Sequence, residues 1–343
     1  MTRGCDGSSS CRVRNAQRTA HGAQPLLSLG AALAAAAAGC FASAGLHDRA
    51  VEHNREGIAR LAEGDLESAA AAFRLALEYN DRFSEPYNNL ALVAIRNGDL
   101  DDAERLLRHA LRLNQDFAEA WTNLGAVRLR RGDPEQAVAA LLEAVRIDPG
   151  QLDARYDLVL ALLETAQLAA AWEQALRLDV ASPEDPAVLG LVGWVAAGLG
   201  RTEEALGWAT RAMAAEPREP LANLAAGTVL LLRGQAAEAE PFLRTATAAD
   251  LGPTPWCQLG IALLALGRWE KARAALERAL ETRPDLLPAL VGAGTAAAAS
   301  GDVVGAKRFL GRALELDAEG ETRLTDEQRE SATRLLEEIQ SAE

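Results

Sequence analysis

The sequence predicts an all-α protein of stacked two-helix repeats, because of its composition and a regular alanine spacing. Hydrophobic residues make up 49% of the 343 residues and aromatic residues only 4%, so the apolar side chains are mostly those of Ala and Leu. These residues favour helices over strands. Alanine recurs every 34 residues, with a single step of 33, at Ala69, Ala103, Ala137, Ala171, Ala205, Ala239, Ala272 and Ala306. A small residue at a fixed period indicates one structural motif repeated along the chain.

The alanine register divides residues 50–320 into eight repeats, with these alanines at position 20. The repeats span 50–83, 84–117, 118–151, 152–185, 186–219, 220–252, 253–286 and 287–320. Position 15 is Gly in every repeat but the fourth, and the next residue is often Asp. Because Gly ends helices and Asp caps their starts, each repeat is expected to be a helix–turn–helix pair. Small residues at positions 8 and 20 are expected to let the two helices cross closely, with larger residues at position 24 around the crossing.

The fourth repeat departs most from this pattern. It has Val159 at position 8, Ala166 at position 15 and Leu178 at position 27, where the other repeats mostly have Gly or Ala. These residues allow two interpretations, a softer joint in the array or a repeat whose sequence has drifted.

A further helix is expected after the last repeat, within residues 321–343. Thr325 and Gln328 have the spacing of a capping box, which marks the start of a helix. An apolar helix face follows at i, i+3, i+4 and i+7, formed by Ala332, Leu335, Leu336 and Ile339. We interpret this segment as a capping helix, because the last repeat would otherwise expose its apolar side.

Two repeats carry the residue pattern of a known family. The signature positions hold Trp121, Leu124, Gly125, Ala137, Leu141, Ala144 and Pro149 in one repeat, and Trp256, Leu259, Gly260, Ala272, Ala279 and Pro284 in another. Over residues 50–320 the chain resembles the tetratricopeptide repeat (TPR) family. The resemblance implies an α-solenoid of eight helix-turn-helix TPR units forming a right-handed superhelix, with a concave groove lined by the first helix of each repeat.

In that family, positions 2, 5, 9, 12 and 13 of the first helix face the groove, which gives a set of candidate partner-binding residues. In the early repeats these positions or their neighbours are polar and suit the backbone of an extended peptide: Asn54, Asn88, Asn89, Asn123, Arg96 and Arg130. In the later repeats they are apolar and suit an amphipathic helix: Trp194, Leu224, Leu231, Leu232, Ile261 and Leu264. The alternative is that several of these side chains pack against the adjacent repeat.

No combination of residues points to an enzyme, a cofactor or a metal site. His47 and His53 are six residues apart, which does not place them on one helix face. Val291–Gly294 resembles half of a phosphate-binding loop, but it lies inside a helical repeat. The formal net charge of −14 disfavours nucleic acid as a partner. Acidic C-terminal peptides, which carboxylate-clamp relatives bind, are also disfavoured, because Asp153 and Asp157 stand where that pattern needs basic residues.

Residues 1–39 are expected to be a signal peptide for export. A stretch with several arginines precedes an uncharged apolar run at residues 26–38, as in secretory signals. Residues 37–40 resemble a bacterial lipobox, which would make Cys40 a lipidated N-terminus. Residues 40–49 would then be a tether that holds the folded part at the periplasmic side of the outer membrane.

Other interpretations of the leader stay open. Cleavage after Ala44 would release a soluble periplasmic protein. An uncleaved span over residues 26–46 is just long enough to anchor the chain in the inner membrane. A start of translation at Val13 is a further alternative, because the stretch before the apolar run is long.

The sequence therefore predicts a non-enzymatic protein–protein interaction scaffold in the bacterial cell envelope. Its groove would hold a peptide or helix of a protein partner, without cofactor or nucleic acid, while a lipid on Cys40 binds the membrane. Exported TPR lipoproteins resemble pilotins and pilus-assembly factors, which favours a role in pilus or secretion-complex assembly. The alternatives are an accessory subunit that presents substrate to a cell-envelope enzyme, and a membrane-anchored cytoplasmic adaptor.

Overall fold

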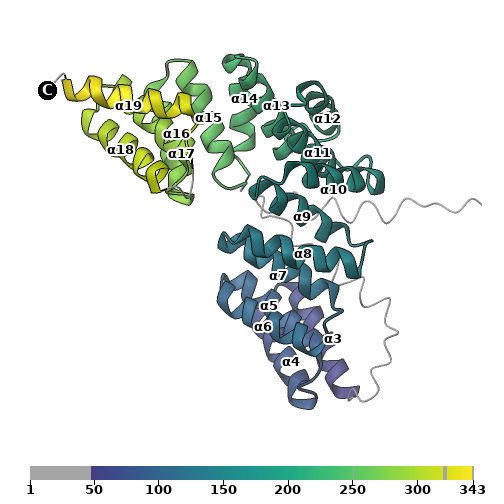
Figure 1. The fold of residues 1–343 in the computed structure, drawn as a ribbon. Coiled ribbons are helices and arrows are strands. Elements are labelled where there is room, and N and C mark those ends of the chain that lie inside the picture. The colour runs from purple at the N-terminus through teal and green to yellow at the C-terminus, as the bar shows by residue number, and fades with distance from the viewer. Residues whose placement is uncertain (1–47, 250, 320–322, 342–343) are drawn as a thin grey trace, which may run out of the picture. The chain divides into compact units, whose positions relative to one another are not determined.

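The computed structural model of the chain describes residues 48–249, 251–319 and 323–341 (Figure 1). These residues form seventeen α-helices and no strand, which confirms the predicted all-α helical-repeat fold. They fall into two compact bodies that divide between Pro183 and Glu184. We call residues 48–183 the N-terminal body and the described residues from 184 to 341 the C-terminal body.

The N-terminal body consists of four helix pairs, one for each of the first four repeats. They are α3 (Asp48–Glu63) with α4 (Leu66–Tyr79), α5 (Ser84–Asn97) with α6 (Leu100–Leu113), α7 (Ala118–Arg131) with α8 (Pro134–Ile147), and α9 (Leu152–Glu164) with α10 (Leu168–Ala181).

The C-terminal body consists of four further pairs and a final helix. They are α11 (Pro186–Gly198) with α12 (Thr202–Ala215), α13 (Pro220–Leu232) with α14 (Ala236–Ala246), α15 (Thr254–Ala265) with α16 (Trp269–Thr282), α17 (Leu287–Ala299) with α18 (Val303–Glu319), and the last helix, α19 (Asp326–Ser341).

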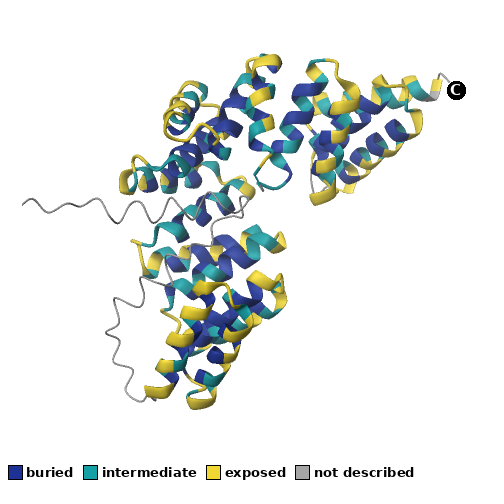
Figure 2. Cartoon of the chain, turned by 180° about the vertical axis from the view of Figure 1, so that it is seen from behind, coloured by how far each residue is buried: buried dark blue, intermediate teal, exposed yellow. Residues whose placement is uncertain are grey.

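Within each body the helices pack in the same order. The first helix of a repeat packs against its own second helix, which in turn packs against the first helix of the next repeat. Consecutive first helices also contact each other, as α5 and α7 do in one body and α15 and α17 in the other. Buried residues lie between the helices and exposed residues on their outer sides (Figure 2). The first helices of each body therefore form a continuous row.

Small residues hold the two helices of each repeat close together. The alanines at position 20 are all fully buried, at 0% exposure. At position 8, a Cβ atom on Gly125 would overlap the Cγ atom of Leu141, and Gly260 stands in the same relation to Leu276. Both leucines occupy position 24 and are fully buried. The predicted close crossing of the two helices is confirmed.

The fourth repeat fills the corresponding space with the side-chain sizes exchanged. Its position 8 is Val159 on α9 and its position 24 is Ala175 on α10, and both are fully buried. The larger residue has thus moved to the first helix and the smaller one to the second, which keeps the total volume at the crossing. Volume-conserving exchanges are the changes that cores tolerate best. The exchange at Val159 is what a drifted repeat would show, while the division between the two bodies at the end of this repeat is where a softer joint would lie, so both interpretations stay open.

The turn of the fourth repeat is strained. In the other three repeats of the N-terminal body, Gly64, Gly98 and Gly132 adopt the left-handed conformation, with φ of 84°, 81° and 79°. Ala166 occupies this place after α9 with φ of 56°, the one positive value at a non-glycine residue in the described ranges. A residue with a Cβ atom loses about 1–2 kcal/mol in this conformation. The chain tolerates the strain at one of its eight such turns.

Aspartates cap several of the second helices, as predicted. Asp65, Asp99 and Asp302 each accept a hydrogen bond from the backbone N–H three residues further on, at 3.1, 3.0 and 2.9 Å. Asp133 occupies the same place before α8 but makes no such hydrogen bond. Three of the four predicted caps are therefore confirmed.

The capping box of α19 forms as the sequence predicted. The N–H of Gln328 donates to Oγ1 of Thr325 at 3.2 Å, and the N–H of Thr325 donates to Oε1 of Gln328 at 3.1 Å. In the same turn, Nε of Arg329 lies 2.6 Å from Oδ2 of Asp317 on α18. The helix packs on both α17 and α18. It therefore covers the last repeat and closes the core of the C-terminal body.

Candidate partner-binding site

The candidate site is the outward stripe along the first helices. Positions 2, 5, 9, 12 and 13 lie on one side of a helix, because they follow each other at helical spacing. Position 8 points instead at the second helix of the same repeat, as Gly125 and Leu141 show. We call the stripe on α3, α5, α7 and α9 the N-terminal face, and the stripe on α11, α13, α15 and α17 the C-terminal face.

The asparagines of the N-terminal body pair with one another across repeats. Nδ2 of Asn89 donates to Oδ1 of Asn54 at 2.9 Å, and Nδ2 of Asn123 donates to Oδ1 of Asn88 at 2.8 Å. Asn54, Asn88 and Asn89 are only 7%, 5% and 6% exposed, while Asn123 is half-buried. This corrects the prediction for the three buried residues. Positions 5 and 6 face the neighbouring repeats, so their amides satisfy each other and are not free to bind a peptide backbone.

Two arginines remain accessible on the N-terminal face. Arg96 is exposed, and its Nη1 atom donates to the carbonyl oxygen of Leu61 in the preceding repeat at 2.9 Å. Arg130 occupies the same position of the next repeat and is half-buried. Both residues carry a positive charge that a partner can reach, and their role in binding stays a prediction.

A buried acid lies on α9 beneath this face. Asp157 is 4% exposed, and burial together with the charge of Asp153 raises its pKa to about 8, although the charge of Arg130 acts in the opposite direction. Asp157 is therefore mostly protonated and neutral at pH 7. This position therefore holds a neutral, buried acid where the carboxylate-clamp pattern needs a basic residue.

The first helices of the C-terminal body carry no charged residue. The sequences of α11, α13, α15 and α17 contain no Asp, Glu, Lys, Arg or His, whereas every first helix of the N-terminal body contains several charged or ionisable groups. Two of the polar side chains on these helices are already bonded to backbone. The amide of Asn223 donates to the carbonyl oxygens of Pro217 and Glu219, and Oγ1 of Thr295 donates to that of Val291. The C-terminal face is therefore an uncharged, largely apolar surface.

The predicted apolar residues of this face differ in how accessible they are. Leu224 is only 2% exposed, so the prediction that it meets a partner is corrected: it belongs to the core. Leu232 is 65% exposed at the end of α13. The remaining four are half-buried, and their role in binding stays a prediction: Trp194, Leu231, Ile261 and Leu264.

Leu224 is buried because α11 and α13 approach each other closely. Gly190 on α11 leaves room for the carboxylate of Glu219, which a Cβ atom at that position would overlap. Glu219 precedes α13 and accepts a hydrogen bond from the N–H of Ala222 at 2.5 Å. It is 4% exposed, and burial raises its pKa to about 8 in spite of this hydrogen bond. A neutral acid thus caps α13 at this contact.

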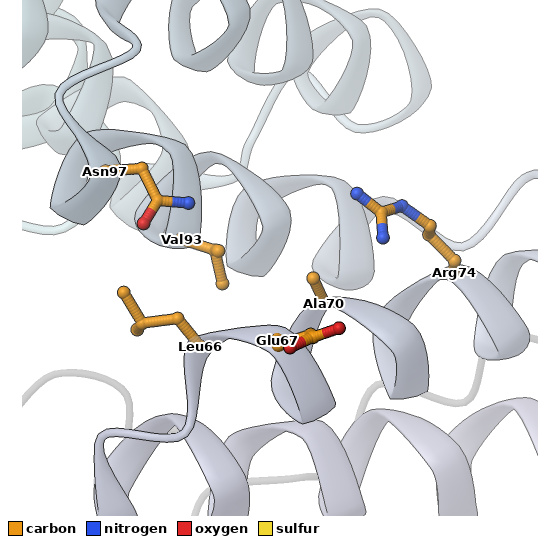
Figure 3. Close-up of a pocket in the computed structure, with 6 residues that line it drawn as sticks. All are labelled: Leu66, Glu67, Ala70, Arg74, Val93 and Asn97. Carbon is orange, nitrogen blue, oxygen red and sulfur yellow. The ribbon is translucent and has the colours of Figure 1, made fainter.

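A small crevice of about 350 Å³ lies between α4 and α5 (Figure 3). Leu66, Glu67, Ala70 and Arg74 line it from α4, and Val93 and Asn97 from α5. None of these residues falls on positions 2, 5, 9, 12 or 13 of a first helix. The crevice is therefore separate from the N-terminal face, and no sequence pattern singled it out.

The cysteine and the two histidines of the described residues lie buried or against aromatic rings. Burial raises the pKa of the Cys257 thiol to about 12, so the reactive thiolate is scarce at neutral pH. His53 stacks on Tyr79, and the ring of His109 packs against Tyr87. Within the described ranges, no group of three or more His, Cys, Asp and Glu side chains is arranged to hold a metal ion.

The predicted leader lies outside the described residues. This holds for the signal peptide at 1–39, for Cys40, and for the predicted tether at 40–49 except its last two residues. In the part of the chain that the structure describes, no helix has the length and apolar character needed to cross a membrane.

Comparison with known proteins identifies the repeat. Family models described as tetratricopeptide repeat match residues 88–151, 128–195, 220–245 and 253–286. No curated protein sequence matches the chain. A tetratricopeptide repeat protein from Parabacteroides merdae ATCC 43184 has the same fold, with a TM-score of 0.59 at 15% identity over 73% of this chain and 99% of that one.

A second solved structure, the APC/C hetero-tetramer Cut9–Hcn1, matches with a TM-score of 0.60 at 14% identity. The match covers 87% of this chain and 57% of that one. At such identities both structures show the shared fold. The 34-residue register, the helix pairs and the family models all lead to the same conclusion: the chain belongs to the tetratricopeptide repeat family.

Proposed function

We propose that this TPR protein is an interaction scaffold that binds segments of a partner protein on its first-helix faces. One observation carries the proposal: four successive first helices have no charge, and on them Leu232 stays 65% exposed while Trp194 and Leu231 are half-buried. Soluble proteins rarely expose contiguous apolar surface that binds nothing. The two faces then suit different contacts, polar ones near Arg96 and Arg130 and apolar ones on the C-terminal face.

A photo-crosslinker placed in living cells tests the scaffold role. We expect a crosslinking amino acid at Leu232 to capture a defined partner, and the same group at Val180 to capture none. Val180 is a matched control, because it is 83% exposed but lies on a second helix, α10. Changing Trp194 and Leu231 to Asp should remove the capture. If the partner is recovered equally with and without these two changes, the proposal is refuted.

The proposed location is the cell envelope, and it rests on the sequence of residues 1–39 and Cys40. Radiolabelled palmitate should label the wild-type chain and the Cys257→Ser variant, because the buried Cys257 is no acceptor, and should fail to label Cys40→Ser. N-terminal sequencing of the mature protein is expected to find no residue before Cys40. A mature chain that still contains residues 26–33 would refute export by cleavage.

Within the envelope, we propose a role in the assembly of a pilus or a secretion complex. The combination of a TPR array with the export signal predicted at residues 1–39 supports this role. Deleting the gene should then reduce surface pili or secretin multimers, and a copy with Trp194→Asp and Leu231→Asp should fail to restore them. Protease added to spheroplasts should digest the protein, whereas protection would support a cytoplasmic adaptor instead.

The proposed role is non-catalytic. It is supported by the chemistry of the described residues, where the Cys257 thiol is protonated and the two histidines pack against tyrosines.

A further inference from the structure

The C-terminal face ends in a pocket of about 400 Å³ between the last repeat and the capping helix. Thr295, Ala298 and Ala299 line it from α17, where they occupy positions 9, 12 and 13 of the eighth repeat. These are positions of the outward stripe, so the pocket opens onto the C-terminal face.

The opposite walls of the pocket are apolar. Leu335 and Ile339 line it from α19, one helical turn apart, and Val303 lines it from the start of α18. Val304, which follows Val303 in the sequence, is 78% exposed. The capping helix therefore does more than cover the last repeat, because it also builds one side of an open apolar cavity. The cavity is large enough for a bulky apolar side chain.

One charged residue lies at this pocket. Glu338 of α19 belongs to its lining and is exposed. Among the residues that the structure describes, none forms an ion pair with its carboxylate. Residues 184–343 contain 16 basic and 24 acidic residues, a net charge of −8 that attracts a basic partner. A partner that places an apolar group in the pocket and a cation beside Glu338 would therefore match both features of this site.

The hydrogen bonding of the face favours a helical partner over an extended one. An extended peptide presents backbone N–H and C=O groups that need partners when they are buried. On the C-terminal face the hydroxyl of Thr295 is already bonded to a backbone oxygen, and the hydroxyl oxygen of Thr228 is buried from the surface, although it has no hydrogen-bond partner among the described residues. A helix satisfies its backbone internally and can bury an apolar side without such groups.

We propose that the C-terminal face binds an amphipathic α-helix of a partner protein, with a large apolar side chain in the α17–α19 pocket and a Lys or Arg paired with Glu338. The inference rests on the proposed scaffold function and names its partner. The apolar side of that helix carries no charge where it crosses α11, α13 and α15, because those helices offer no counter-charge.

Two other occupants fit the charges less well. A fatty acid carries an anionic head, which the Glu338 carboxylate repels. A second copy of this chain would bring the same Glu338 and the same net negative charge to the contact. Both occupants are also outcomes that the experiment below detects.

The test uses the full chain and three fluorescent helical peptides of about 18 residues each. The first carries leucines along one side of the helix, one Phe for the α17–α19 pocket, and a Lys next to that Phe for Glu338. The second has Glu in place of that Lys, and the third has the composition of the first with the stripe scrambled. We expect the first peptide to bind at least about tenfold more tightly than either of the others.

Exchanging the charge on the protein identifies the pocket. Glu338→Lys should reverse the order of the first two peptides, whereas Glu330→Lys, an exposed change of equal charge on the same helix, should leave it unaltered. Ala298→Trp should fill the pocket and weaken the first peptide about tenfold or more. Circular dichroism shows whether each variant keeps its helices. If Ala298→Trp does not fold, Glu338→Lys still tests the inference, because it does not fill the pocket.

Each result either supports or overturns the inference. Equal binding of the scrambled peptide, or an unchanged peptide order in Glu338→Lys, overturns it. Displacement of the first peptide by laurate at low concentration makes the pocket an acyl-chain site instead. Sedimentation that shows a dimer lost in Ala298→Trp makes it a self-association site. If partner capture at Leu232 persists without peptide binding, only this inference fails, whereas loss of both removes the scaffold function as well.

Discussion

The first helices of the N-terminal body carry charges on every helix, whereas those of the C-terminal body carry none. Both bodies nevertheless use the same crossing, in which Gly125 meets Leu141 in one and Gly260 meets Leu276 in the other. Charged pairs join successive repeats in both bodies, as Arg131 does with Glu104 in one and Arg273 with Asp302 in the other. Asparagine amides that link neighbouring first helices occur only in the N-terminal body among the described residues. The inner crossing thus specifies the scaffold, and the outer stripe is free to vary in chemistry.

The largest effect is expected at the crossing that the two bodies share. Leu141→Ala in one body and Leu276→Ala in the other should each lower the free energy of unfolding by about 2–5 kcal/mol, because both side chains are fully buried. Urea denaturation followed by circular dichroism measures this. A much smaller loss in one body would show that the two do not share the same crossing.

A second substitution sharpens this test. Adding Gly125→Val to Leu141→Ala recreates the sizes that Val159 and Ala175 have in the fourth repeat. The double variant should recover at least about 1 kcal/mol of the loss, because it refills the cavity. Gly125→Val alone should destabilise, since Leu141 leaves no room for its side chain. If the stability losses of the two single variants simply add in the double variant, the two positions do not compensate each other in volume.

The pH dependence of stability should come from one buried acid in each body. The pKa of Asp157 and of Glu219 is raised to about 8 from ordinary values of 3.8 and 4.5. The folded protein keeps these protons while the unfolded chain loses them as the pH rises from about 4 to 8. The free energy of unfolding should therefore fall across this window, by up to about 1.4 kcal/mol per pH unit and group.

Neutral replacements check this pH dependence. Asp157→Asn and Glu219→Gln stay uncharged at every pH, so each should flatten the slope measured by urea denaturation between pH 5 and pH 8. The groups around Glu219 that shape its titration are the N–H groups of Ala222 and Leu221 and the carboxylates of Glu216 and Asp185. Glu238→Gln, an exposed change, serves as the control. A slope that both buried variants leave intact would contradict the assignment.

A smaller effect is expected at the strained turn that occurs only in the N-terminal body. Ala166→Gly should raise the free energy of unfolding by about 0.5–1 kcal/mol, because glycine accepts a φ of 56° without a steric penalty. The reverse change at the matching turn, Gly132→Ala, should destabilise by a similar amount. Thermal unfolding of both variants measures the difference, and a loss of stability in Ala166→Gly would argue against the strain.

The smallest effect on stability is expected for substitutions of exposed residues outside the helix crossing. Leu232→Arg and Val180→Arg change residues that are 65% and 83% exposed, so each should alter the free energy of unfolding by less than about 0.5 kcal/mol. Only Leu232→Arg should weaken the helical peptide, because Val180 lies away from both faces. Equal loss of peptide binding in the two variants would remove the distinction between the C-terminal face and the rest of the surface.

The parts of the fold that depend on local spacing could be predicted from the sequence. The alanine register is fully buried, and the Thr325–Gln328 capping box forms both of its hydrogen bonds. A fixed period shows which side of each first helix packs against the second helix of the same repeat. Because this packing recurs in every repeat, a register position has the same environment throughout residues 50–319.

The accessibility of the candidate site could not be predicted in the same way. It depends on how closely successive first helices approach, and the period does not encode that distance. Gly190 and the buried Glu219 bring α11 and α13 together, which covers Leu224. The amides of Asn54 and Asn89 satisfy each other across repeats. The pocket at Glu338 was also missed, since it forms only where the last repeat meets the capping helix.

The paired asparagines of the N-terminal body have a mechanical consequence. Hydrogen bonds have a preferred length and direction, so the amide pairs resist sliding of one repeat past the next. Contacts between apolar surfaces carry no such directional preference. Sliding of one first helix past the next should therefore be resisted more strongly in the N-terminal body, where these amide pairs lie.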